Sequence, residues 1–158
     1  GFLQIFNQIT SLNEISFISH VKKSPYHSNI YAKKWIQEIA APIKLNKDGL
    51  VTQYMLNNKN TGIIASKKHK DFGIGKNFTI YHKLCNILEI PIKFREINYL
   101  AGSFFVIRSF IIKDFFEKLN IQIFSNDLDD CFDSTFAHAC ERAIFAYVRS
   151  KNFKIAWI

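Results

Sequence analysis

Several features that mark large classes of protein are missing from this chain of 158 residues. No apolar run approaches the roughly 20 residues that a membrane-spanning helix needs, and the run at residues 104–107 stops at Arg108. The N-terminus has no basic segment followed by a long apolar core, so no signal peptide is recognisable. An initiator methionine is also missing, and we therefore expect residues to be absent upstream.

Paired cysteines are lacking as well. Cys85, Cys131 and Cys140 are single residues, and none belongs to a Cys-x-x-Cys motif. Three thiols cannot all pair within one chain, and scattered single cysteines are typical of a reducing cytosol. We expect these side chains to act as small buried hydrophobic residues, and we predict a cytoplasmic protein.

Familiar catalytic motifs are missing too. The chain has no Gly-x-Ser-x-Gly, which argues against a serine hydrolase. Gly73 and Gly75 lack the third glycine of a dinucleotide-binding fingerprint, and we expect this loop to give backbone flexibility over a substrate. Internal repeats, Gly/Ser linkers and low-complexity tracts are absent, so residues 1–158 are predicted to form a single domain.

The composition is that of a basic chain with enough hydrophobic residues to form a core. Hydrophobic residues make up 48%, which excludes a disordered tail, and the formal net charge is +8. This excess of positive charge suits nucleic acid, an anionic membrane surface or a phosphate-rich substrate. The basic residues are dispersed and no nucleic-acid reader motif occurs, which weakens the first of these interpretations.

Hydrophobic spacing predicts helices alternating with strands. Helices are expected at residues 2–12, 30–41 (ending at Pro42), 50–56, 78–89, 110–119 and 133–150. Strands are expected at residues 15–19, 62–66, 99–107 (broken at 101–103) and 154–158. This alternation predicts the α/β class, with a mixed, mostly parallel sheet flanked by helices.

Asp133 is the first residue that suggests chemistry. It is suited to the N-cap of the last long helix, where the helix dipole favours the ionised carboxylate. Such a carboxylate at the mouth of a cleft is able to accept a proton from a sugar hydroxyl. Plain helix capping explains the same residue, and spacing alone favours capping over the catalytic role.

Four segments, in order, resemble the rhamnan synthesis protein F family. Residues 99–108 (YLAGSFFVIR) are similar to the family's "aGtmFwfR" segment, and residues 133–142 (DSTFAHACER) to its "DGTLAHAIER" helix start. Residues 20–25 (HVKKSP) resemble its "HTKKS" segment, and residues 72–77 (FGIGKN) its "W-G-x-N" loop. The resemblance covers about residues 15–158, and departures such as Val21 for Thr and Phe72 for Trp concern substrate choice.

The resemblance implies a bacterial glycosyltransferase that builds cell-surface polysaccharide such as rhamnan, O-antigen or capsule. The fold would be GT-A-like, with this chain an incomplete, C-terminal part of the domain. By fold-level analogy Asp133 would be the catalytic base, with Asp130 or Asp129 as substitutes. Gly102 and Ser103 would allow close approach of the sugar, and Arg108, at the end of the same segment, would also bind the substrate.

A metal site is not supported by the sequence. GT-A enzymes usually hold a divalent metal through Asp-x-Asp at a strand end, and here that spacing occurs only in a late loop at residues 127–129. We therefore expect no resident cofactor, with Lys22 and Lys23 holding the diphosphate and His20 and Ser24 donating hydrogen bonds. A solvated basic turn is the alternative for this loop.

Other residues carry weaker signals. Residues 67–70 (KKHK) could touch phosphate or a membrane surface, although such runs usually form a solvated face. His138 and Glu141 have a permissible metal-ligand spacing without a third ligand. Trp35 and Trp157 could stack on a sugar, but burial in the core is favoured for both. A core stripe is expected at Phe136, Cys140, Ile144 and Val148.

The sequence thus leads to one main hypothesis and two alternatives. The main one is transfer of a hexose or deoxyhexose from a nucleotide-sugar donor to a glycan or lipid-linked glycan acceptor. Peripheral contact with the inner face of the cytoplasmic membrane is expected with it. The alternatives are a non-catalytic glycan-binding or scaffold module of the same pathway, and a nucleic-acid-binding domain suggested by charge alone.

Overall fold

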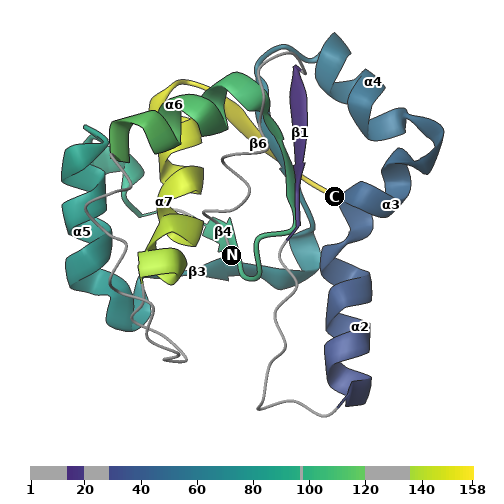
Figure 1. The fold of residues 1–158 in the computed structure, drawn as a ribbon, viewed down its shortest axis with the longest axis horizontal. Coiled ribbons are helices and arrows are strands. Elements are labelled where there is room, and N and C mark those ends of the chain that lie inside the picture. The colour runs from purple at the N-terminus through teal and green to yellow at the C-terminus, as the bar shows by residue number, and fades with distance from the viewer. Residues whose placement is uncertain (1–13, 20–28, 97, 120–135) are drawn as a thin grey trace.

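A four-stranded sheet forms the centre of the computed structural model, which describes residues 14–19, 29–96, 98–119 and 136–158 (Figure 1). The strands lie in the order β1-β5-β2-β6. Their bounds are Ile15–Ile18 for β1, Thr61–Ala65 for β2, Phe105–Arg108 for β5 and Lys154–Trp157 for β6. Within the described ranges, no helix is long and apolar enough to cross a membrane.

The strand directions confirm a mixed sheet but not a mostly parallel one. β5 is antiparallel to both of its neighbours, β1 and β2, and only β2 and β6 pair in parallel. The expectation of a mostly parallel sheet is therefore wrong. Because β5 lies inside the sheet, its reversed direction makes two of the three pairings antiparallel.

The reversal of β5 follows from the connection that precedes it. After β2 the chain leaves through η2 (Lys67–His69) and β3 (Lys70–Phe72), and it returns along β4 (Asn98–Leu100). β3 and β4 pair antiparallel in a small second sheet, with Lys70 opposite Leu100. The connection therefore begins and ends at the same end of the main sheet, and Phe105 at the start of β5 pairs with Ala65 at the end of β2.

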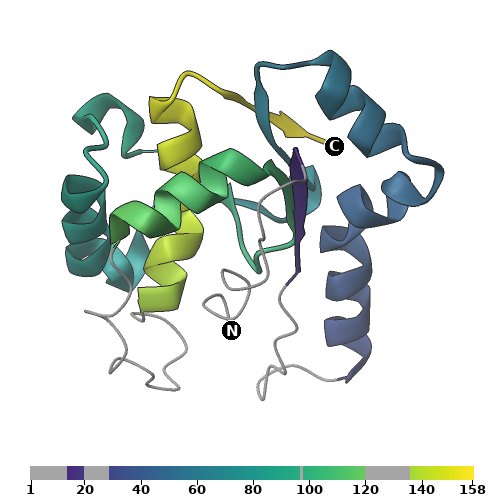
Figure 2. The same ribbon diagram turned by 45° about the horizontal axis from the view of Figure 1, so that its top comes forward.

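Helices cover both faces of the main sheet (Figure 1). On one face α4 (Leu50–Asn57) packs Val51 and Met55 against Ile64 and Val106. On the other face α6 (Ser109–Leu119) and α7 (Phe136–Ser150) share a larger core with the alternate strand residues. Figure 2 shows α6 crossing α7, where the rings of Phe115 and Tyr147 meet edge to face. Because β2 is covered on both faces, all five of its residues are buried, and the apolar residues Ile63, Ile64 and Ala65 follow one another without alternation.

The predicted stripe on α7 is core, as expected. Phe136, Cys140, Ile144 and Val148 are all buried, and burial raises the pKa of the Cys140 thiol. Cys85 in α5 (Phe78–Ile87) is likewise buried and free, and its pKa is also raised by burial. The described cysteines therefore behave as small hydrophobic residues.

Two local expectations need refinement. Pro42 does not simply end a helix, because α2 (Asn29–Ile39) stops before it and a short helix α3 (Ala41–Leu45) begins around it. A proline is tolerated there because the first turn of a helix does not use its N–H groups. The strand expected at residues 99–107 is two strands in different sheets. The helix expected at residues 2–12 and the first residues of the one at 133–150 lie outside the described residues.

Candidate functional site

A cleft of about 320 Å³ opens between the small sheet, α5 and α7. Its walls come from β3, the glycine loop that follows it, α5, the segment before β4, β4 itself and α7. The lining residues are Phe72, Gly73, Ile74, Gly75, Phe78, Tyr81, Arg95, Glu96, Tyr99 and Arg142. This volume is at the lower end of the roughly 300–1,000 Å³ that ligand-binding clefts usually have.

The glycine loop shapes one side of the cleft and exposes two aromatic rings. Gly73 and Gly75 have φ angles of 100° and 57°, a left-handed conformation that glycine adopts without strain. Phe72 and Phe78 flank this loop and are 63% and 61% exposed. Exposed apolar rings beside a cleft are suited to stacking on a sugar ring or a nucleotide base.

Tyr99 and Arg142 form the floor where β4 meets α7. The Arg142 guanidinium lies over the Tyr99 ring, 4.6 Å from its centroid, and Nη1 donates to the carbonyl of His138 at 2.9 Å. The Tyr99 hydroxyl donates to Asp71 Oδ2 at 3.1 Å. Burial raises the pKa of Tyr99 to about 12, an effect that Arg142 opposes and Asp71 reinforces. The phenol therefore stays protonated at neutral pH and does not act as a base.

Arg95 is held at the opposite wall by the end of α5. Its Nε donates to the carbonyl of Ile90 at 3.0 Å, and its Nη2 donates to Asn86 Oδ1 at 2.7 Å. Its own carbonyl accepts a hydrogen bond from the Tyr81 hydroxyl at 2.5 Å. The cleft thus carries two positioned guanidinium groups, Arg95 and Arg142, which are suited to planar anionic or hydroxyl-rich ligands.

Gly102 and Ser103, both predicted site residues, do not line the cleft. Ser103 is buried and its hydroxyl donates to Glu141 Oε1 at 2.6 Å, which ties the turn between β4 and β5 to α7 next to Arg142. Gly102 has a φ of 104°, and a Cβ there would come within 2.5 Å of the Trp35 ring. The close approach that Gly102 permits in this structure is that of Trp35 in α2.

Arg108 lies at the other end of β5 and is not brought to the cleft. Its guanidinium is buried and donates to three backbone carbonyls, those of Met55 (2.7 Å), Asn58 (3.2 Å) and Thr61 (2.9 Å). A second, smaller hollow of about 260 Å³ adjoins it. The observed role of Arg108 is to hold the α4–β2 connection against β5.

The remaining predicted site residues lie outside the part of the chain that the structure describes. They are Asp133, Asp130 and Asp129 for proton transfer, and His20, Lys22, Lys23 and Ser24 for the diphosphate. Among the described lining residues, Glu96 is the single carboxylate. Within the same described ranges, no cluster of three or more potential metal ligands occurs. The described residues that line the cleft therefore supply binding groups rather than a proton-transfer pair.

The basic run at residues 67–70 is partly occupied by internal partners. His69 Nε2 lies 2.8 Å from Glu38 Oε2, and Lys68 Nζ lies 3.6 Å from Glu38 Oε1. Lys70 Nζ lies 5.3 Å from the centroid of the Trp157 ring, which itself stacks on Phe145. Trp157 and Trp35 are both partly buried against the core, as the sequence favoured.

Sequence reasoning missed several residues of the cleft. Phe72 and Tyr99 fall inside segments that the sequence singled out, but their side chains were not chosen. Phe78 had a detectable signal, since it stands beside a glycine loop at the start of a helix. Arg95 and Glu96 carry no sequence signal, because only the return of the chain from α5 to β4 brings them to the cleft.

Comparison with known proteins returns no relative of this chain. No family model matches it, and no curated protein or solved structure matches it.

Proposed function

We propose that this chain is a glycosyltransferase domain of the rhamnan synthesis protein F type, acting in bacterial surface polysaccharide synthesis. It would move a hexose or deoxyhexose from a nucleotide-sugar to a growing glycan. One observation carries the proposal: three segments that resemble the family, residues 72–77, 99–108 and 133–142, all contribute to the surroundings of one cleft.

The convergence is informative because these segments are far apart in the chain. Phe72 to Gly75 form the glycine loop, Tyr99 comes from β4, and Arg142 comes from α7. Ser103 and Glu141 join the second and third segments directly behind the cleft. Motifs that served only core packing would have no reason to gather around a single solvent-open hollow.

The chemistry of the cleft suits a sugar-bearing substrate. Phe72 and Phe78 offer faces for stacking, and Arg95 and Arg142 offer fixed hydrogen-bond donors. In the proposed reaction Asp133 deprotonates the acceptor hydroxyl in an inverting transfer, with Asp130 as its substitute. Lys22 and Lys23 stabilise the departing diphosphate without a metal ion.

The GT-A-like fold belongs to the same proposal. Its support is a mixed sheet with helices on both faces and a cleft at one end of the sandwich. The reversed strand β5 and the small β3–β4 sheet are the features that any closer comparison with GT-A enzymes has to match.

A thermal-shift screen against UDP, GDP, dTDP and CMP, each with and without Mn²⁺, tests nucleotide binding. A ligand at a hundredfold excess over its Kd adds about 2.7 kcal/mol to the native state, or about 5–10 °C for a domain of this size. We expect one nucleotide to raise the melting temperature, equally with and without the metal. Absence of a shift with all four would contradict the transferase proposal for this chain.

Transfer itself is tested with Asp133→Asn. We expect the variant to keep the nucleotide-dependent thermal shift and to lose about a hundredfold or more of the sugar-transfer rate, because the base is removed while the binding groups remain. Nucleotide release from the matching nucleotide-sugar, with a polysaccharide acceptor present, measures this rate. An unchanged rate would show that Asp133 is not the base.

The non-catalytic alternative is favoured by one observation: the described wall of the cleft has stacking and hydrogen-bonding groups but a single carboxylate. A glycan-binding module would bind polysaccharide, release no nucleotide from any nucleotide-sugar, and be insensitive to Asp133→Asn. The two experiments above therefore separate the two functions.

A further inference from the structure

The turn between α3 and α4 presents apolar side chains to solvent. Leu45 ends α3 and is 49% exposed, and Leu50 begins α4 and is 56% exposed. Tyr54 lies one helical turn after Leu50, on the same side of α4, and is also exposed. The core-facing side of α4 is formed by Val51 and Met55. We call Leu45, Leu50 and Tyr54, together with the turn that joins them, the α3–α4 corner.

Hydrogen bonds fix the conformation of the turn in the α3–α4 corner. Asn46 Oδ1 accepts hydrogen bonds from both the backbone N–H and the hydroxyl of Thr52, each at 2.9 Å. Gly49 takes the left-handed conformation at φ 73° and its N–H donates to the carbonyl of Asn46 at 2.9 Å. The two leucines are therefore held in fixed positions on either side of the turn.

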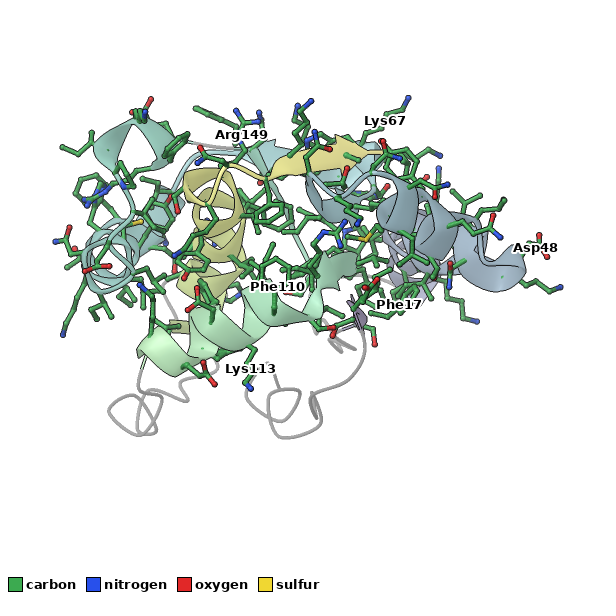
Figure 3. All side chains as sticks on the ribbon, turned by 90° about the horizontal axis from the view of Figure 1, so that it is seen from above. Phe17, Asp48, Lys67, Phe110, Lys113 and Arg149 are labelled. Carbon is green, nitrogen blue, oxygen red and sulfur yellow. The ribbon has the colours of Figure 1, made fainter. Side chains whose placement is uncertain are left out.

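The corner carries more positive than negative charge. Lys44 and Lys47 are exposed within it, and Lys44 Nζ also donates to the carbonyl of Gln37 at 3.2 Å. Along residues 29–59, lysines at 33, 34, 44, 47 and 59 outnumber the acidic residues Glu38 and Asp48. Glu38 is already paired with His69 and Lys68. Asp48 is thus the one negative side chain of the corner, and Figure 3 shows it at the outer end of this layer of helices.

We propose that the α3–α4 corner docks on an anionic lipid bilayer. Leu45 and Leu50 would enter the boundary between headgroups and acyl chains, and Tyr54 would lie at the headgroup level. Lys44 and Lys47 would face the anionic headgroups, which attract basic residues near the surface. The lysines of the corner favour an anionic bilayer as the partner. A purely apolar protein surface would not need lysines beside the exposed leucines.

The corner and the cleft are on different parts of the molecule. α3 and α4 lie on one side of the main sheet, whereas α5 and α7, which line the cleft, lie on the other (Figure 1). Docking through the corner therefore leaves the cleft open. The two proposals rest on different residues, so failure of one does not decide the other.

Vesicle sedimentation tests the docking. The full chain is mixed with sucrose-loaded vesicles of phosphatidylcholine alone, or of equal parts phosphatidylcholine and phosphatidylglycerol. We expect binding to the anionic vesicles, weakened by added salt, and little binding to the neutral ones. Lys47→Ala should lower the partition coefficient about fivefold, and Asp48→Asn should raise it by a similar factor. The double variant Leu45→Ser/Leu50→Ser should abolish sedimentation.

A matched control removes the same kind of surface elsewhere. Ile87 and Ile92 are exposed, Ile92 to 81%, at and beyond the end of α5. The double variant Ile87→Ser/Ile92→Ser should bind anionic vesicles like the unaltered chain. Binding that falls equally in both double variants, or no binding by the unaltered chain, would overturn the proposal. So would corner variants that change self-association in ultracentrifugation but leave vesicle binding intact, since the corner would then be a protein interface.

Discussion

At the scale of single residues, Gly102 shows how tightly the region behind the cleft is packed. Its φ of 104° already disfavours any side chain, and a Cβ would meet Trp35 at 2.5 Å. Gly102→Ala should therefore lower the free energy of unfolding by about 2–4 kcal/mol, from backbone strain plus overpacking. Urea unfolding followed by circular dichroism measures the loss.

Gly73→Ala is the matched control for this prediction. Gly73 has a similar φ of 100°, but apart from its two chain neighbours no residue has an atom within 4 Å of the position that an alanine methyl group would take there. Gly73→Ala should therefore lower the free energy of unfolding only by the cost of backbone strain, about 1–2 kcal/mol. Equal losses in the two variants would contradict a role for the Trp35 contact.

Arg108 is the second residue with a measurable structural role. Arg108→Met removes the donors to three carbonyls, two of them in buried hydrogen bonds, and should destabilise the chain by more than about 2 kcal/mol. Arg149→Met is the control, because Arg149 is exposed on the surface (Figure 3) and should change stability by less than about 0.5 kcal/mol. A similar small change in Arg108→Met would leave substrate binding as the better explanation of this arginine.

At the scale of elements, Glu38 joins α2 to η2 through His69. The hydrogen bond from His69 holds the pKa of Glu38 below its ordinary value of 4.5, and Lys68 adds to the effect. A lowered folded-state pKa means that the pair stabilises the chain above pH 4.5. This stabilisation is lost as the pH falls through the folded-state pKa.

We expect the difference in melting temperature between the unaltered chain and Glu38→Gln to depend on pH. The unaltered chain should melt at a higher temperature above about pH 5, and the two curves should converge in acid. Glu117→Gln is the control, because the Lys113–Glu117 pair is more than half exposed and contributes little. If the difference in melting temperature caused by Glu38→Gln stayed the same at acidic pH, the carboxylate charge would not be what stabilises this contact.

The elements themselves could be predicted from the sequence better than their connections. Hydrophobic patterning located β1, β2, β6, α2, α4 and α6 to within a few residues, because most of them bury one face with its own spacing and β2 is a short, fully buried run. The direction of β5 could not be predicted in this way. It depends on the β3–β4 pairing between Lys70–Phe72 and Asn98–Leu100, which is a contact between distant segments. Neither strand has enough residues to give a periodic pattern.

At the scale of the whole molecule, the cleft forms because the fold brings together segments that are distant in the sequence. The sequence pointed to the glycine loop, to the segment around Gly102 and to the helix that contains Arg142, and the structure brings all three to one region. The sequence did not indicate that Arg142 would stack on Tyr99, or that hydrogen bonds to Ile90 and Asn86 would fix Arg95. Those contacts exist only after α5 and β4 have packed against α7.

In the proposed function, this cleft holds the sugar-bearing substrate of a transferase. The most direct test measures the thermal shift caused by nucleotide-sugars in the unaltered chain, in Phe72→Ala/Phe78→Ala and in Phe110→Ala. Phe110 is an exposed aromatic residue like the other two, but it borders the smaller hollow beside Arg108 (Figure 3). We predict that one nucleotide-sugar stabilises the unaltered chain and Phe110→Ala equally, and that the shift is lost in Phe72→Ala/Phe78→Ala. An equal shift in all three proteins, or no shift with any nucleotide-sugar, would show that the cleft does not hold such a substrate.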